Sequence, residues 1–106
     1  VVSTSVPGRA IVDAGSKSLS SDTHQVVHGS GFGMIKTDPD ADVERLSEEH
    51  GNLNIARSTR EYRVGERLAI IPNHVCSTVN MHNRIYGVRG ERVEVVWEVA
   101  GRGKVQ

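Results

Sequence analysis

Residues 70–80 read Ile-Ile-Pro-Asn-His-Val-Cys-Ser-Thr-Val-Asn, and the candidate chemistry of the chain lies here. The apolar run 68–71 stops at Pro72 and is followed by His74 and by Cys76, the only cysteine. On an extended segment, side chains two residues apart point to the same face, which would place the imidazole and the thiol side by side. Zinc accepts both ligands. The spacing indicates a candidate metal pair, although it also fits two side chains that are merely packed.

The composition describes one small domain without a dominant charge. The chain has 106 residues, and its 13 basic and 13 acidic side chains cancel. No block of one sign favours nucleic acid or an anionic membrane surface as a partner. One cysteine allows no internal disulfide, which suits a reducing cytoplasm, and no apolar run reaches the roughly 18–20 residues of a membrane span. We therefore expect a cytoplasmic domain, and a start at Val1 fits an excised domain as well as a processed chain.

Alternation of apolar and polar residues predicts a mainly β domain. Short runs of this kind are expected to form strands at residues 9–14, 25–28, 34–36, 43–47, 53–55 and 67–71. Between them, we expect glycine turns at 29–33, a turn at Asp38-Pro39-Asp40 and a polar loop at 16–22. This loop fits a surface position, and it also fits a loop that faces a partner or an anionic group with Lys17 as its charge. Because no long helical pattern appears, the predicted fold is a single small β-barrel or β-sandwich-like domain with little helix.

The clearest strand signal lies near the end of the chain. Residues 84–88 and 92–99 flank Arg89-Gly90-Glu91 and predict a β-hairpin. One face of its second strand would carry Val93, Val95, Trp97 and Val99. Trp97 is expected in the core, because a strand-face aromatic buries a large apolar area.

Glu48, Glu49 and His50 form a second group of candidate residues. Carboxylates beside an imidazole can perform acid–base chemistry or add a metal ligand. The same three residues also fit a solvated cluster before a turn, since charged side chains usually remain in water. From the residues alone, both interpretations stay open.

Four motifs cover most of the chain in order. They are Val-Asp-Ala-Gly-Ser-Lys-Ser-Leu-Ser at 12–20, Leu-Ser-Glu-Glu-His-Gly at 46–51, Val-Gly-Glu-Arg at 64–67 running into Ile-Pro-Asn-His-Val-Cys at 71–76, and Trp-Glu-Val-Ala-Gly-Arg-Gly at 97–103. Together they resemble the C-terminal β domain of the D-serine dehydratase / D-threonine aldolase family, which is similar to pyridoxal-phosphate enzymes of the alanine racemase type.

The resemblance implies that residues 1–106 are the metal-bearing β domain of a larger enzyme. In such enzymes a barrel domain holds pyridoxal phosphate on a lysine, and 106 residues cannot supply the roughly 200 or more that a (β/α)₈ barrel needs. No lysine here matches that position, so we expect no catalytic residue and no lyase activity in this chain alone. The implied partners are the barrel domain of the same protein, a small D-amino acid substrate and a second subunit in a homodimer.

The resemblance also assigns site residues. It implies that His74 and Cys76 bind a metal, zinc with manganese as the alternative, and that His50, Asn73 and Glu49 line the site or support the ligands. The aldolase branch resembles this chain but favours aspartate at the position of Cys76. The thiolate therefore favours a zinc-dependent D-serine dehydratase that forms pyruvate and ammonia.

Three alternatives remain. One is a D-threonine aldolase-type enzyme that cleaves its substrate by a retro-aldol reaction. Another is a free-standing β module that binds a partner or ligand without catalysis. A structural zinc domain is the third, and it would need four protein ligands where only one cysteine exists.

Overall fold

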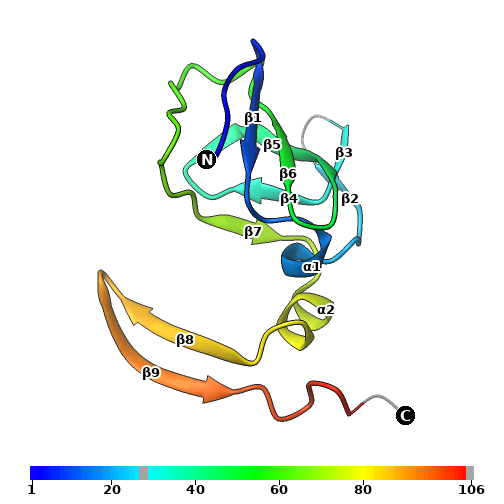
Figure 1. Ribbon diagram of the computed structural model, residues 1–106, viewed down its shortest axis with the longest axis vertical. Coiled ribbons are helices and arrows are strands. Elements are labelled where there is room, and N and C mark those ends of the chain that lie inside the picture. The colour runs from blue at the N-terminus through cyan, green and yellow to red at the C-terminus, as the bar shows by residue number, and fades with distance from the viewer. Residues whose placement is uncertain (27–28, 105–106) are drawn as a thin grey trace.

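The computed structural model describes residues 1–26 and 29–104, and most of its regular structure is β (Figure 1). A five-stranded antiparallel sheet has the strand order β1-β6-β5-β4-β7, and β2–β3 and β8–β9 form two separate ribbons. The prediction of a mainly β domain with little helix is confirmed. In the described residues none of these sheets closes into a barrel, so the predicted barrel or sandwich describes the fold only loosely. The elements are β1 (Arg9–Val12), α1 (Ser16–Leu19), β2 (His24–Val26), β3 (Gly29–Gly31), β4 (Gly33–Ile35), β5 (Asp38–Leu46), β6 (Gly51–Asn54), β7 (Ile70–Pro72), α2 (Val75–Asn80), β8 (Arg84–Arg89) and β9 (Arg92–Glu98).

The core lies on one face of the five-stranded sheet. Burial alternates along β1 and β6, as expected for strands with one face against the core and one toward water. Ile35, Val43 and Leu53 are the largest fully buried side chains, and they come from β4, β5 and β6. Their alternation in the sequence is what made these strands predictable.

Three local predictions differ from the structure. Residues 16–19 form the short helix α1 where a loop was expected, and the glycine-rich segment contributes to β3 and β4. The turn expected at Asp38-Pro39-Asp40 instead lies at residues 36–37, between β4 and β5. Ile35 pairs with Asp38 across this turn, and the register then shifts, so that Met34 pairs with Asp42. The irregularity tolerates Pro39, which has no N–H to donate to a strand ladder. The strand predicted at 25–28 is observed as β2, and its last two residues lie outside the described part of the chain.

A buried carboxylate holds the long segment between β6 and β7 onto the sheet. Asp38 Oδ2 accepts hydrogen bonds from Ser58 Oγ and Tyr62 Oη, each at 2.6 Å, and Asp38 Oδ1 accepts one from the Asp40 amide. Burial raises the pKa of Asp38, but these hydrogen bonds outweigh it and lower the pKa below its usual value. Burial and the carboxylate together raise the pKa of the Tyr62 phenol well above 10.

The pKa shifts of Asp38 and Tyr62 predict that the chain loses stability both at acidic and at alkaline pH. A depressed carboxyl pKa stabilises the fold above its ordinary value of about 4, and this contribution is lost as the pH falls through the folded pKa. A raised phenol pKa contributes fully below about pH 10 and is lost as the pH rises beyond it. We expect Tyr62→Phe to cost about 1–2 kcal/mol at neutral pH, because Asp38 loses a donor. Urea unfolding followed by circular dichroism at several pH values measures both effects.

Tyr86→Phe is the matched control, because Tyr86 lies exposed on the hairpin. The alkaline loss of stability should shrink in Tyr62→Phe and persist in Tyr86→Phe. An unchanged alkaline loss in Tyr62→Phe would show that another group causes it.

The β8–β9 hairpin stands apart from the five-stranded sheet and is joined to it through α2 (Figure 1). The predicted strands and their turn are confirmed, but the predicted core position of Trp97 is wrong for this chain, since 51% of it is exposed. The indole lies against Gly87, where an added Cβ would come within 3.0 Å of the ring. It packs on its own hairpin because nothing in the described residues covers that face.

The exposed hairpin makes the molecule unusually open for its size. The chain has 7336 Å² of accessible surface, whereas a compact monomer of 11.5 kDa should have about 5,800 Å². Its radius of gyration is 14.5 Å, against about 13 Å for a compact domain of this length. The excess of about 1,500 Å² is about twice the roughly 800 Å² that each partner buries in a standard protein–protein interface.

Among residues 1–26 and 29–104, no helix has the length and apolar character needed to cross a bilayer.

Candidate metal centre at the start of α2

The His74–Cys76 pair lies where β7 ends and α2 begins. Pro72 is the last residue of β7 to pair with β4, and His74 is the extended residue that caps α2, with φ −133° and ψ 103°. The Thr78 side chain donates a hydrogen bond to the His74 carbonyl at 2.8 Å, and the Thr78 amide donates to the same oxygen, which closes the first helical turn. The prediction that His74 and Cys76 share an extended segment is therefore wrong, because Cys76 already belongs to the helix. The side chains of His74 and Cys76 are both exposed, and one residue separates them in the sequence.

One nitrogen of His74 is held by a residue that the sequence did not single out. His74 Nδ1 lies 2.7 Å from Asp22 Oδ2, and the same oxygen accepts a hydrogen bond from Ser77 Oγ at 2.6 Å. Ser20 Oγ lies 3.2 Å from it as well. The bonds from Ser77 and His74 lower the pKa of the Asp22 carboxyl. No pattern in the sequence joins residues 52 positions apart, and the polar character of 16–22 was the only hint that this loop has a partner.

The loop that carries Asp22 is fastened to α2 at further points. The Asn73 amide donates to the carbonyls of Asp22 and Gly31, so this predicted site residue anchors the segment before His74. Thr78 Oγ1 lies 3.1 Å from the Leu19 carbonyl oxygen, and His82 Nε2 donates to the Ser18 carbonyl. The start of α2 is thus tied to α1 and to the loop that follows it.

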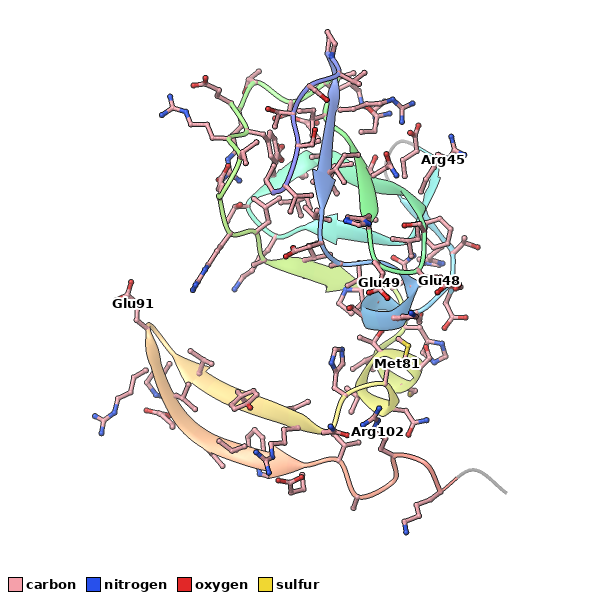
Figure 2. The ribbon with its side chains drawn as sticks, viewed as in Figure 1. Arg45, Glu48, Glu49, Met81, Glu91 and Arg102 are labelled. Atoms are coloured by element: carbon pink, nitrogen blue, oxygen red, sulfur yellow. The ribbon has the colours of Figure 1, made fainter. Side chains whose placement is uncertain are left out.

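The second predicted cluster, Glu48, Glu49 and His50, belongs to the loop that packs against the start of α1. Lys17 Nζ is 2.6 Å from Glu49 and 3.1 Å from Glu48 (Figure 2). The ion pair with Glu49 raises the pKa of Lys17, and Lys17 in turn lowers the pKa of Glu49. Both acids are exposed, as is His50, which agrees with a solvated cluster. Within the described chain, no hydrogen bond or ion pair links these residues to the His74–Cys76 pair.

Gly15 allows the motif at residues 12–20 to lie directly against the motif at residues 46–51. A Cβ on Gly15 would lie 2.3 Å from the Glu48 carbonyl oxygen and 2.5 Å from that of Ser47. The amides of Ser16 and Lys17 donate to these carbonyls. Only glycine allows this close approach, and the approach sets the position of α1 and of the loop that reaches His74.

The metal donors form a pair rather than a complete cage. Among the described residues, no group of three or more histidine, cysteine, aspartate or glutamate side chains is arranged to hold an ion. An open cleft of about 1280 Å³ lies between α1, the end of α2 and the hairpin, and His74 and Cys76 are not part of its lining. Its walls include Lys17, Tyr86 and Arg102, the last labelled in Figure 2. The cleft lies where the hairpin is separated from α1.

Comparison with known proteins places these features in a family. The family model described as "Putative serine dehydratase domain" matches residues 1–88. An uncharacterized protein of Mycobacterium tuberculosis is 38% identical over 96 residues, which are 91% of this chain and 71% of that protein. The 3-hydroxy-D-aspartate aldolase of Paracoccus denitrificans is 35% identical over 104 residues, 98% of this chain and 24% of the enzyme. The crystal structure of D-threonine aldolase from Filomicrobium marinum matches with a TM-score of 0.81 and 35% identity.

The relatives have two very different lengths. This chain is covered completely by the Filomicrobium marinum enzyme but spans only 27% of it, so the separated hairpin also has its counterpart in a much longer polypeptide. The 96 aligned residues make up 71% of the mycobacterial protein, which is therefore about 135 residues long and too short for a barrel of roughly 200 residues. Its relatives thus include a long enzyme, of which the matched region is 27%, and a small protein, of which it is 71%.

Proposed function

The chain belongs to the serine dehydratase domain family, and we propose that it is the metal-bearing β domain of a pyridoxal-phosphate-dependent lyase acting on D-3-hydroxy amino acids. The observation that carries this proposal is the exposed His74–Cys76 pair, in which Asp22 already occupies one imidazole nitrogen. Homology to aldolases supports the lyase class. D-serine dehydration, giving pyruvate and ammonia, is the reaction we favour.

The donor set fits zinc. His74 offers Nε2, and Cys76 offers a thiolate, two ligands of the kind found in zinc sites. Manganese prefers oxygen ligands, so it suits this pair less well. Two protein ligands leave positions open, which is typical of catalytic rather than structural zinc.

The chemistry follows from where these residues would hold the metal. When bound, zinc supplies a Lewis acid for the substrate β-hydroxyl, and pyridoxal phosphate in a barrel domain supplies an electron sink for the α-carbon. His74 and Cys76 fix the position of the metal, and their exposure leaves it accessible to a substrate bound elsewhere. Asn73 anchors the turn that presents them. Glu49 and His50 remain proposed lining residues.

The hairpin supports a barrel domain as the partner. Trp97 and Val93 are each about half exposed, and the ion pairs Arg84–Glu98 and Arg89–Glu94 neutralise charges within the hairpin. An exposed apolar face of this kind fits another protein surface better than water. We propose that the barrel covers this face in the whole protein, which we expect to be a homodimer.

The choice between dehydration and retro-aldol cleavage depends on Cys76. The named relatives are aldolases, which favours cleavage. The thiolate favours zinc and, by resemblance, the dehydratase branch. We retain the D-threonine aldolase-type reaction as the alternative within the same class of enzyme.

A chimeric enzyme tests the proposal. This chain would replace the matching 27% of the Filomicrobium marinum D-threonine aldolase, whose remaining domain then supplies the missing partner. With zinc, we expect pyruvate from D-serine to exceed cleavage of D-threonine, and Cys76→Asp should shift the preferred metal toward manganese and the products toward cleavage. Pyruvate and aldehyde assays measure the two reactions, and the parent aldolase is the control.

A folded chimera that binds pyridoxal phosphate but lacks both activities would contradict the proposal. So would activity that is unchanged by His74→Ala and by Cys76→Ala. The isolated chain, supplied with pyridoxal phosphate and zinc, should show neither reaction.

A free-standing β module remains the second candidate, because the mycobacterial relative is too short for a barrel. In that case the hairpin would be covered by a second copy or by a separate protein. Sedimentation of the isolated chain distinguishes a specific dimer from a monomer that aggregates without a defined size.

A further inference from the structure

We propose that Asp22 is a positioning residue for His74, holding the imidazole in the tautomer and orientation that leave Nε2 free for a metal. This inference rests on the proposed function, because it concerns the same metal pair. The geometry that supports it is the 2.7 Å contact between Asp22 Oδ2 and His74 Nδ1.

The contact determines which nitrogen carries the proton. An ionised carboxylate accepts hydrogen bonds and donates none, so a neutral His74 that bonds to it must carry its proton on Nδ1. Nε2 then has a free lone pair, and no residue in the described part of the chain bonds to it. Histidine ligands in metal sites commonly donate their other nitrogen to a carboxylate in this way, which fixes the ring.

Asp22 is itself held in place. Ser77 Oγ and Ser20 Oγ donate to the same oxygen that His74 contacts, and the Asn73 amide donates to the Asp22 carbonyl. Ser20 is buried at the C-terminal end of α1, two residues before Asp22, and adopts φ 67°, a conformation uncommon outside glycine. The Asp22 carboxylate is therefore held both by Ser20 at the end of α1 and by Ser77 in α2.

The exposure of the pair separates positioning from fold stability. The side chains of Asp22 and His74 are 48% and 52% exposed, and ion pairs in such settings contribute little to folding. Asp22→Ala should therefore leave the chain folded while releasing the imidazole. A merely structural contact would have no effect on the tautomer or on the metal.

Two measurements on the full chain test the inference. Nitrogen-15 NMR of His74 at about pH 8, where a free imidazole is neutral, should show the proton on Nδ1 in the wild type and mainly on Nε2 in Asp22→Ala. Zinc affinity, measured by competition with a chelator, should fall about 10–100-fold in Asp22→Ala. Asp22→Asn keeps an acceptor oxygen and should recover part of this loss. Asp13→Ala removes the same charge from an exposed residue away from the pair and should change neither readout.

The outcomes are distinguishable. If the wild type binds zinc and Asp22→Ala binds it equally well, the positioning role of Asp22 is wrong while the metal pair stands. A wild-type proton on Nε2 also overturns the inference. If the folded wild type binds no zinc, the proposed metal site fails, and the role of Asp22 fails with it.

Discussion

Replacing Leu53 by alanine is expected to destabilise the chain by about 2–5 kcal/mol, because it removes a fully buried side chain from the centre of the sheet. Leu53 lies on β6, between β1 and β5, and pairs with Ala10 and Val43 across the two ladders. Its neighbours are held by those ladders and can fill the cavity only in part. Thermal unfolding followed by circular dichroism should show a midpoint lowered by roughly 4–8 °C for each kcal/mol lost.

Trp97→Ala is the informative comparison, although it deletes a larger side chain. Trp97 is half exposed on a hairpin that packs against nothing else in the described residues, so we expect its loss to cost less than about 1 kcal/mol. A cost equal to that of Leu53→Ala would show that the hairpin is covered in solution by another copy of the chain. Repeating the measurement at two protein concentrations identifies that case, since association makes stability depend on concentration.

The contrast between these two residues shows what alternation in a sequence can predict. Alternation placed Leu53 in a strand and Trp97 on the apolar face of a hairpin, and both placements are confirmed. It could not say whether another surface covers that face. Burial of Leu53 is determined by strands within this chain, whereas residues 1–26 and 29–104 leave Trp97 half exposed, and alternation cannot distinguish the two cases.

The candidate site shows a second limit. The His74–Cys76 pair was identifiable from residue types and spacing, and the family resemblance gave it a role. The strand expected there is a helical turn, because the hydrogen bond from Thr78 Oγ1 to the His74 carbonyl favours it locally. The contact with Asp22 depends on the position of α1, which Gly15 allows to approach residues 47–48 closely. Such long-range contacts leave no periodic signal in one sequence.

Replacing either His74 or Cys76 by alanine is expected to weaken zinc binding to the chain by more than about 100-fold, because loss of a direct ligand should exceed the effect of losing its supporting residue. Wild-type binding should be one-to-one. It should also be weaker than in a four-ligand structural site, since two protein ligands leave the other positions to water. Isothermal titration with zinc measures both stoichiometry and affinity, and circular dichroism checks that each variant is folded.

His24→Ala is the matched control, because it removes an imidazole from an exposed residue of β2 without touching the pair. Equal losses in His24→Ala and His74→Ala would mean that zinc binds imidazoles on the surface without selection. Loss in His74→Ala but none in Cys76→Ala would also contradict the proposed pair, because the thiolate is the reason for preferring zinc over manganese. Loss in both, with His24→Ala unchanged, would establish a site built by His74, which caps α2, and by Cys76 in the first turn of that helix.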